Sequence, residues 1–438
     1  MKISVFGTGY VGLVSSACLA QLGHNVIGVD ILPEKVSMLN RGESPIIESG
    51  LSELVKSAVD GGTLRATHNV MDAVAATDIS LISVGTPSSA DGSISISAVR
   101  DVLGPIGDAI RSKGSEHTVV VRSTIPPGMS DEILIPMLER ASGRQINHGL
   151  FYYVNPEFLR EGTAIHDFHN PPFTLVGAQP GDDAPILRTL YGALAGPVNV
   201  TSIRVAESVK FLSNAYHALK LAFANEAGAI LGSCGVDARV AFQVFCEDRQ
   251  LNISPAYLRP GFAFGGSCLP KDVRALVSFA SSRNIATPLL RSILPSNEQV
   301  IERAYGAITK HERQPVALFG LSFKPGTDDL RESPFVTLAE RLLGKGYDLT
   351  IFDERVDTAR LMGENRRYIE REIPHLERLL APTPMAALNR ARIAIIGHVS
   401  AQFVPQVVAA LRGQVVIDLA GVRELERHSN IQYEGLCW

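Results

Sequence analysis

Short apolar segments alternate with helical segments along the first 200 residues. Apolar runs that are typical of buried strands occupy residues 2–7, 25–30, 78–85, 118–124, 151–158 and 173–177, and apolar residues with helical spacing lie between them. Strands that alternate with helices form a parallel sheet with helices on both faces. We therefore predict an α/β domain with a doubly wound parallel sheet over residues 1–200.

The pattern changes after residue 200. Residues 203–231 contain no Pro and one Gly, Gly228, and are rich in Ala, Leu, Lys and Glu; this predicts one long helix of about eight turns. Strand–helix alternation returns after residue 311, with strands expected at 316–323, 347–353, 391–397 and 414–421. We predict a helical domain with this long central helix at 201–310 and a second doubly wound α/β domain at 311–438.

Composition narrows the class of protein. With 45% apolar and 20% charged residues the chain is globular, and a net charge of −4 does not indicate a binder of nucleic acid or of membrane surfaces. Residues 201–300 nevertheless carry ten basic and seven acidic side chains, so an anionic ligand is expected there. Five cysteines without a C-x-x-C pair argue against a disulfide framework and a zinc site. We therefore expect no metal. We also expect a cytoplasmic protein, because no apolar run of membrane-spanning length occurs and the first residues lack the dense basic region of a signal peptide.

A glycine-rich motif follows the first predicted strand. Gly7, Gly9 and Gly12 form G-x-G-x-x-G, the motif opens a predicted helix, and a second predicted strand ends on Asp30, 18 residues after Gly12. This context is the dinucleotide-binding fingerprint of a Rossmann-like domain, in which the pyrophosphate lies at the helix N-terminus. Asp30 would accept hydrogen bonds from the ribose hydroxyls and repel a 2′-phosphate, so we predict NAD as the cofactor.

Three further residues are weaker candidates for the same site. Lys35 could reach the ribose or adenine, but a solvated lysine is an equal alternative. Thr86 and Thr124 each follow a predicted strand, at the edge where open α/β sheets bind ligands, and a turn-forming threonine is the alternative for both.

Cys268 is the candidate nucleophile. In PGFAFGGSCLPKDVRAL, at residues 260–276, Gly265 and Gly266 deliver Cys268 to the start of a predicted helix, with Lys271 and Asp272 one turn later. A helix N-terminus and a nearby lysine favour the reactive thiolate. A thiol beside a nicotinamide suggests oxidation of an aldehyde through a thiohemiacetal and a thioester. We expect Cys18, Cys234 and Cys246 to be inert and buried; Cys437 lies in the tail.

The long helix carries a polar stripe. Lys210, Asn214, His217 and Asn225 fall within an arc of about 80°. The neighbouring Leu212, Ala215, Leu219, Ala222 and Phe223 are apolar, so we expect a largely buried helix whose stripe lines a cavity, with a solvated face as the alternative. Lys210 could stabilise an oxyanion and Asn214 could position a hydroxyl or water.

Two loops add charged candidates. Glu161 in NPEFLREGTA could act as a general base, with a surface carboxylate as the alternative. Lys324 and Arg331 in GLSFKPGTDDLRESP lie in a loop without G-x-G-x-x-G, where side-chain cations could bind phosphate.

The strings GTGYVG, VGTP, RST, NPEFLREGTA, FGGSCLPKD and GLSFKPGTDDLRESP occur in order across all three predicted domains. Through them the chain resembles the nucleotide-sugar 6-dehydrogenase family, which includes UDP-glucose and GDP-mannose dehydrogenases. It is most similar to the bacterial GDP-mannose branch in RPGFAFGGSCLPKDVRAL, in SNAYHALKLAFANE and in the terminal EGLCW. One difference is Ala256 before Tyr257, where that branch has two adjacent aromatic residues.

The resemblance implies a four-electron oxidation of the GDP-mannose C6 hydroxyl to GDP-mannuronate, with two NAD per sugar, for an alginate-type polysaccharide. It implies a homodimer or higher homo-oligomer built on the long helix, with Arg259 reaching the partner's site. Implied catalytic residues are Cys268, Lys210, Asn214, Asp272, Glu161 and Thr124. Implied NAD contacts are Tyr10, Val11, Asp30, Lys35, Thr86, Thr124, Lys271 and Arg331. Implied nucleotide-sugar contacts are Glu161, Lys210, Asn214, His217, Asn225, Tyr257, Arg259, Phe262, Gly265 and Lys324.

Three alternatives stay open. A UDP-glucose 6-dehydrogenase would use the same mechanism. A two-electron dehydrogenase of the hydroxyacid type would leave Cys268 and the third domain without a role. A non-catalytic NAD-binding protein would be indifferent to loss of the thiol.

Overall fold

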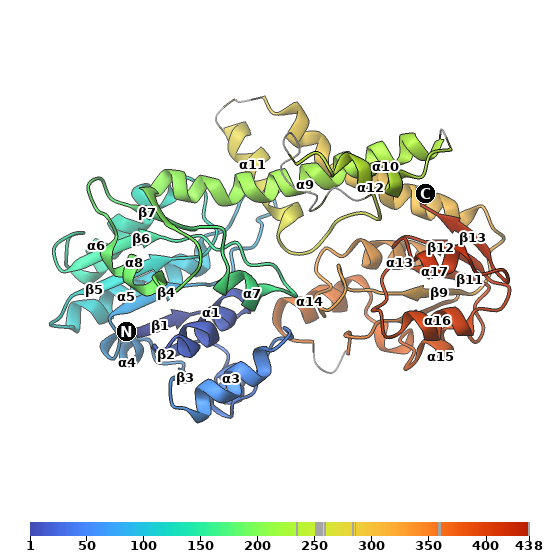
Figure 1. Ribbon diagram of the computed structural model, residues 1–438. Coiled ribbons are helices and arrows are strands. Elements are labelled where there is room, and N and C mark those ends of the chain that lie inside the picture. Colours follow the sequence, from blue (N-terminus) through green and yellow to red (C-terminus); the bar gives the residue numbers. More distant parts are fainter. Residues whose placement is uncertain are drawn as a thin grey trace. The chain divides into compact units, whose positions relative to one another are not determined.

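The computed structural model of the protein describes residues 1–233, 235–249, 257, 260–282, 284, 286–357 and 361–436. Two compact units comprise residues 1–213 and 214–438 (Figure 1). The long helix α9 (Ile203–Ser233) confirms the long helix expected from the sequence, and the boundary between the units lies within it.

Unit 1 contains an eight-stranded sheet in the order β3-β2-β1-β4-β5-β6-β7-β8. Its strands are β1 (Lys2–Phe6), β2 (Asn25–Val29), β3 (Leu64–Thr67), β4 (Ile79–Ile82), β5 (His117–Val121), β6 (Leu150–Val154), β7 (Thr174–Ala178) and β8 (Val198–Ser202). The six strands predicted for this region are all present. The edge strands β3 and β8 were missed, because neither has a continuous apolar run and β8 has no buried residue.

The sheet differs from a wholly parallel one at its end. β1 to β6 are parallel, but β7 pairs with β6 in the antiparallel direction and β8 runs parallel to β7. The parallel, doubly wound sheet expected from the sequence is therefore confirmed for β1 to β6, and its last two strands run in the opposite direction. Apolar segments do not reveal strand direction, which depends on the path of the connection between β6 and β7.

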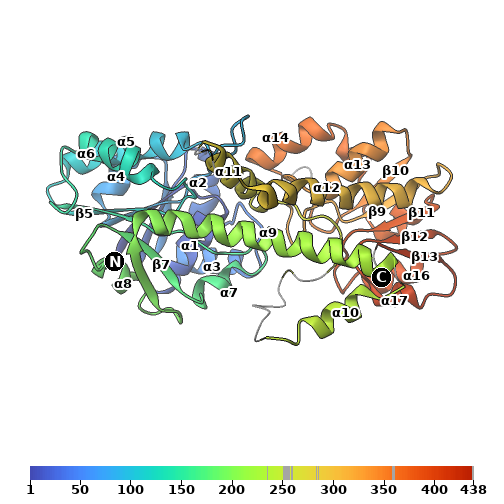
Figure 2. The ribbon, with the colours of Figure 1, turned by 90° about the horizontal axis from the view of Figure 1, so that it is seen from above.

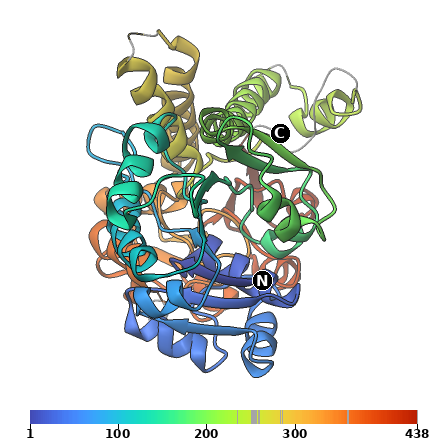
Figure 3. The ribbon, with the colours of Figure 1, turned by 90° about the vertical axis from the view of Figure 1, so that its left-hand side faces the viewer.

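Helices cover both faces of this sheet. Helices α4, α5 and α6 lie on one face and α1, α3, α7 and α8 on the other (Figure 2), and Figure 3 shows the same layers from the end of unit 1. Their bounds are α1 Tyr10–Gln21, α2 Pro33–Asn40, α3 Leu51–Asp60, α4 Val70–Ala75, α5 Ser97–Ser112, α6 Ile135–Ser142, α7 Ala164–His169 and α8 Pro185–Tyr191, with a π-helical turn at Ser130–Leu134. Along β1, Ile3 and Val5 belong to one core and Phe6 to the other, as the two-residue repeat of a strand requires.

Unit 2 contains a second sheet, which is parallel throughout. Its order is β10-β9-β11-β12-β13, with β9 (Val316–Phe319), β10 (Leu349–Phe352), β11 (Ile393–Ile396), β12 (Val415–Asp418) and β13 (Gln432–Gly435). The four predicted strands are present, and the half-buried edge strand β13 was missed. Its helices are α10 Ala238–Phe245, α11 Leu269–Ser282, α12 Pro288–Thr309, α13 Pro334–Gly344, α14 Gly363–Glu372, α15 Pro384–Leu388, α16 Val404–Ala410 and α17 Arg423–Glu426, with a 3₁₀ turn at Leu376–Arg378.

Across the described residues, no helix combines the length and the apolar character that a membrane span requires.

Candidate active site

The glycine motif forms the turn between β1 and α1. Gly7 has φ +90° and lies against the chain after β4: a Cβ there would be 2.9 Å from the Ser83 carbonyl oxygen. A Cβ on Gly12 would be 1.8 Å from the carbonyl oxygen of Gly7. Gly9 precedes α1, and a Cβ there would meet no atom within 4 Å. The turn is therefore closed at Gly7 and Gly12 and open at Gly9, as a cradle for a pyrophosphate requires.

Two predicted threonines lie at the same edge of the sheet. β1 and β4 are neighbours although a crossover separates them in the sequence, so the strand order reverses between them. Ligands of open α/β sheets bind at such a reversal, beyond the carboxyl ends of the strands. Thr86 follows β4 and is buried, and Thr124 follows β5 and is half-buried.

Asp30 is held at the end of β2. Its Oδ2 accepts hydrogen bonds from the backbone N–H (2.9 Å) and the hydroxyl (2.7 Å) of Thr8, and its Oδ1 accepts one from the Leu32 N–H (3.0 Å). The Lys35 ammonium lies 3.8 Å from Oδ2. Asp30 thus supports the glycine turn itself, a role that the sequence reading did not include.

Tyr10, expected at the cofactor, is the first residue of α1 and donates its hydroxyl hydrogen to Glu48. Glu48 is buried and also accepts from the N–H groups of Gly162 (2.7 Å) and Ala164 (2.9 Å). Burial and the Glu48 carboxylate raise the pKa of Tyr10 well above its usual value. Glu48 therefore ties the start of α1 to the loop that contains Glu161. The sequence reading missed Glu48, because a lone carboxylate between helices carries no pattern.

The structure places Glu157 against Lys210. Lys210 Nζ lies 3.0 Å from Glu157 Oε1, and the two side chains are 7% and 11% exposed, so the ion pair is buried. Burial alone would raise the pKa of Glu157, but the charge and hydrogen bond of Lys210, with smaller contributions from the Leu159 N–H and Arg122, lower the pKa overall. Glu161, the carboxylate singled out from the sequence, is half-buried in the following turn. Glu157 could have been noticed, since it is a carboxylate near the end of the predicted strand at 151–158 and belongs to NPEFLREGTA.

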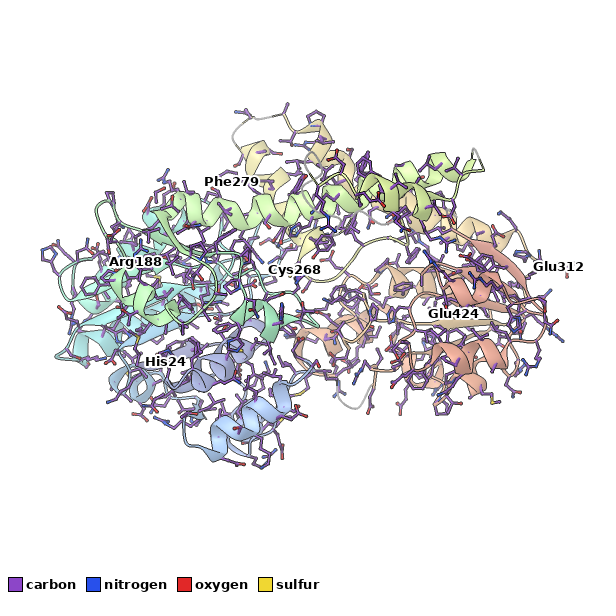
Figure 4. The ribbon with its side chains drawn as sticks, in the orientation of Figure 1. His24, Arg188, Cys268, Phe279, Glu312 and Glu424 are labelled. Atoms are coloured by element: carbon purple, nitrogen blue, oxygen red, sulfur yellow. The ribbon has the colours of Figure 1, made fainter. Side chains whose placement is uncertain are left out.

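Cys268 is exposed and directly precedes α11 (Figure 4). The two glycines before it pack against the loop that follows β9. A Cβ on Gly265 would be 2.3 Å from the Glu332 carbonyl oxygen, and one on Gly266, whose φ is +87°, would be 2.8 Å from the Phe323 ring. Asn297 accepts from the Phe264 N–H (2.9 Å) and donates to the Phe264 carbonyl (2.8 Å). The loop before the thiol is therefore fixed on both sides.

Asp272 and Asn214 are partners within unit 2. The Asn214 side-chain amide donates to Asp272 Oδ2, Lys271 Nζ lies 3.5 Å from Oδ1, and Asp272 is 1% exposed. The Asp272 N–H donates to the Cys268 carbonyl (2.9 Å). Asp272 therefore links α9 to the first turn of the helix that begins after Cys268.

Other expected nucleotide-sugar contacts lie farther along α9. His217 stacks on Tyr257 with ring centroids 4.7 Å apart. Asn225 is buried, accepts from the Gly261 N–H (2.8 Å) and donates to the Phe262 carbonyl (3.4 Å). Phe262 packs on Phe335 at 4.8 Å. Arg259 and Ala256 lie outside the described residues.

The third-domain cations are held locally. Arg331 makes two hydrogen bonds to Asp329, at 2.9 and 2.6 Å. Lys324 Nζ lies over the Phe323 ring at 5.4 Å.

Of the other cysteines, Cys18 is buried, which raises its pKa to about 12, and Cys246 is half-buried. Cys234 and Cys437 fall outside the described residues. Within the described part of the chain, no cluster of His, Cys, Asp or Glu side chains is suited to hold a metal ion.

The polar stripe of α9 lies inward. Lys210, Asn214 and Asn225 are buried and His217 is half-buried. The expectation for the apolar neighbours is partly wrong: Ala215 and Ala222 are buried, but Leu212 and Phe223 are 58% and 50% exposed. Together with the exposed Val205 and Tyr216 they recur at intervals of seven, four and seven residues, which places all four on one side of the helix.

Comparison with known proteins covers the whole chain. Sequence profiles of the UDP-glucose/GDP-mannose dehydrogenase family match its NAD binding domain to residues 1–195, its central domain to 204–299 and its UDP binding domain to 317–424. The GDP-mannose 6-dehydrogenase of Pseudomonas putida is 46% identical over 438 residues, 100% of both chains. A UDP-glucose dehydrogenase structure from Pyrobaculum islandicum is 34% identical, with a TM-score of 0.89 over 100% of this chain and 97% of that one. The ternary complex of GDP-mannose dehydrogenase from Pseudomonas aeruginosa is 44% identical, with a TM-score of 0.58 over 100% of both chains.

Proposed function

Because the chain belongs to the UDP-glucose/GDP-mannose dehydrogenase family, we propose that it oxidises the C6 hydroxyl of GDP-mannose to a carboxylate and yields GDP-mannuronate. The observation that carries this proposal is the full-length similarity to GDP-mannose 6-dehydrogenase, in a chain that has both a dinucleotide turn and an exposed cysteine at a helix start. A role in making an alginate-type polysaccharide is part of the proposal, and so is a cytoplasmic location, which the cysteine composition supports.

The residues of unit 1 fit NAD. The glycine turn is tightly packed at Gly7 and Gly12 and leaves open space at Gly9. With the Asp30 carboxylate beside it, this turn is suited to bind a dinucleotide that lacks a 2′-phosphate. Bound NAD would accept one hydride in each of two oxidations. We assign the cofactor contacts to Gly7, Gly9, Tyr10, Val11, Gly12, Asp30, Lys35, Thr86, Thr124, Lys271 and Arg331.

The chain's own residues would carry the covalent steps. In the first oxidation the C6 alcohol loses a hydride and a proton and becomes an aldehyde. The Cys268 thiolate then adds to the aldehyde carbon, the aldehyde oxygen takes up a proton, and a thiohemiacetal forms. Loss of a second hydride and a proton gives a thioester. Water adds to the thioester carbon, the C–S bond breaks, the carboxylate is released, and the Cys268 thiolate is regenerated as two protons pass to solvent.

Lys210, Asn214 and Asp272 would support these steps. A lysine ammonium and an asparagine amide can stabilise the negative oxygen that develops on C6. The short chain from Asn214 to Asp272 and Lys271 supports this assignment for Asn214. Glu161 is our candidate for the base that activates the water, and Thr124 is expected around the same reacting centre. Glu157 is a second candidate for the base, because its partner is Lys210.

The nucleotide sugar would be held by Glu161, Lys210, Asn214, His217, Asn225, Tyr257, Arg259, Phe262, Gly265 and Lys324. We propose three functional domains: residues 1–200 bind the cofactor, residues 201–310 serve assembly and catalysis, and residues 311–438 bind the nucleotide. UDP-glucose is the second candidate substrate. It is favoured by the similarity to a UDP-glucose dehydrogenase structure and by Ala256 in place of an aromatic residue.

We further propose a homodimer formed along α9. Val205, Leu212, Tyr216 and Phe223 are 41–58% exposed on one side of this helix. Such a stripe resembles the seam by which paired helices bury apolar side chains. Replacing Leu212 with Asp should halve the mass in analytical ultracentrifugation, whereas replacing the exposed Met385 should leave it unchanged.

The function is tested by product stoichiometry. Purified protein is incubated with NAD and either GDP-mannose or UDP-glucose, and NADH and acid are counted per sugar consumed. The proposal expects two NADH per GDP-mannose. One NADH per sugar would indicate a two-electron dehydrogenase, and turnover of UDP-glucose alone would indicate the second candidate. Cys268→Ser should abolish acid formation, whereas the control Cys246→Ser should not; acid formation at the full rate by Cys268→Ser would refute the thioester route.

A further inference from the structure

Arg122 is a buried cation that the mechanism above does not use. It follows β5 directly and is 6% exposed. Its Nη1 donates to Asn155 Oδ1 at 2.8 Å and to the Tyr191 hydroxyl at 2.5 Å, and the Tyr191 hydroxyl donates to the same Asn155 Oδ1 at 2.7 Å. Asn155 and Tyr191 are each 2% exposed. The three side chains therefore form a closed, buried ring of hydrogen bonds.

The ring fixes the chain just before Glu157. Asn155 is the first residue after β6, its N–H donates to the Val121 carbonyl (2.9 Å), and its side-chain amide donates to the Leu175 carbonyl (2.8 Å). Only Pro156, whose φ is restricted, separates Asn155 from Glu157. Fixing Asn155 therefore fixes the position from which the Glu157 side chain extends toward Lys210.

Arg122 also places a positive charge in the protein interior, which by itself lowers the stability of the fold. A buried guanidinium is destabilising unless a negative group compensates it. In the part of the chain that the structure describes, no carboxylate lies within ion-pair distance of Arg122, and its buried Nε has no hydrogen-bond partner. The Arg122 charge nevertheless contributes to lowering the pKa of Glu157, after the larger contributions of Lys210 and of the Leu159 N–H.

We propose that Arg122 is a positioning residue for the Glu157–Lys210 ion pair: through Asn155 it sets the place of the carboxylate, and its buried charge acts on that carboxylate together with Lys210. The charged groups that act on Glu157 are Lys210 from α9 and Arg122 from the end of β5. The catalytic consequence rests on the proposed function, since it requires Lys210 or Glu157 to take part in the oxidation or in hydrolysis.

The kinetic test compares three variants. Arg122→Gln removes the charge, Arg122→Lys keeps it, and Tyr191→Phe keeps the charge but removes one hydrogen bond of the ring. In Arg122→Gln we expect kcat with GDP-mannose to fall about tenfold or more, since a positioned base contributes about 10²–10⁴-fold, while KM for NAD stays near the wild-type value. The acid limb of its kcat–pH profile should move to higher pH. Arg122→Lys should restore the position of the acid limb. An unmoved acid limb in Arg122→Gln, or an equal shift in Arg122→Lys, would overturn the proposal.

A second test does not depend on activity. Thermal unfolding at pH 8 is measured for the wild type, Arg122→Gln, Glu157→Gln and the double variant. If Arg122 acts on the Glu157 carboxylate, Glu157→Gln should remove at least half of the loss in Tm that Arg122→Gln causes. Additive losses would mean that Arg122 is only a structural residue. If the wild type makes no GDP-mannuronate, the proposed function fails, but this cycle still decides whether Arg122 and Glu157 are coupled.

Discussion

Gly265 offers a sharp test of how the thiol loop is positioned. The change is Gly265→Ala, three residues before Cys268. The new Cβ would lie 2.3 Å from the Glu332 carbonyl oxygen and 2.6 Å from Pro334 Cδ. Neither atom can yield easily, because one belongs to the backbone and the other to a ring, and the Glu332 side chain is anchored by Arg274 at 2.6 Å. The loop that holds Cys268 must therefore move.

The size of the movement follows from the contact distances. Ordinary van der Waals contact begins at 3.4 Å, so the Cβ–oxygen distance must grow by about 1 Å, and a misplacement of that size near reacting groups costs about 10²-fold in rate. Overpacking should also cost about 1–3 kcal/mol of stability. For a unit of this size that corresponds to a fall in Tm of about 2–4 °C per kcal/mol.

The assay is initial-rate NADH formation with GDP-mannose and saturating NAD, together with NADH binding by fluorescence and thermal unfolding. We expect kcat to fall about 100-fold, with NADH affinity near the wild-type value. The matched control is Gly261→Ala in the same loop, where a Cβ would meet nothing within 4 Å. Wild-type kcat in Gly265→Ala, or an equal loss in Gly261→Ala, would refute the reasoning from steric contact.

Three further changes test unit 1. Gly12→Ala should abolish NAD binding and lower Tm, because its Cβ would be 1.8 Å from the Gly7 oxygen, whereas Gly9→Ala should leave Tm unchanged. Calorimetry of both variants with NAD measures binding and Tm, and equal Tm losses in the two variants would contradict this prediction. Asp30→Ala should lower the affinity for NAD by about tenfold or more, since a hydrogen bond to a charged group contributes about 1.5–3 kcal/mol, and it should relax discrimination against NADP. An unchanged ratio of kcat/KM for NAD to kcat/KM for NADP would show that Asp30 is not part of the cofactor site. Lys210→Met leaves Glu157 as a buried, less compensated carboxylate, which should cost about 3–5 kcal/mol near neutral pH. Because Lys210 lowers the pKa of Glu157 in the folded protein, the pair stabilises the fold above the unfolded pKa of about 4.3 and that contribution is lost as pH falls through the folded pKa. The Tm loss of Lys210→Met should therefore be larger at pH 8 than at about pH 3, and an equal loss at both would contradict it.

Local patterns in the sequence predicted most of the fold. The ten strands expected from apolar runs are present, and so is the long helix, because a buried parallel strand and a long helix both leave continuous local signals. The glycine turn and the cysteine at the start of α11 were recognisable for the same reason: their chemistry depends on residues that are adjacent in the chain. The edge strands β3, β8 and β13 lack such a signal, since their side chains are only partly buried.

Only the tertiary structure decided how distant residues combine. The pairs Tyr10–Glu48, Lys210–Glu157 and Arg122–Asn155 join positions 38, 53 and 33 residues apart, and no local spacing predicts them. The exposure of Leu212 and Phe223 likewise depends on which parts of the chain cover each side of α9. The sequence by itself thus determined the chemical groups and the elements that bear them. The packing of those elements determined which charges are buried together, and burial is what gives Glu157, Lys210 and Arg122 their influence on one another.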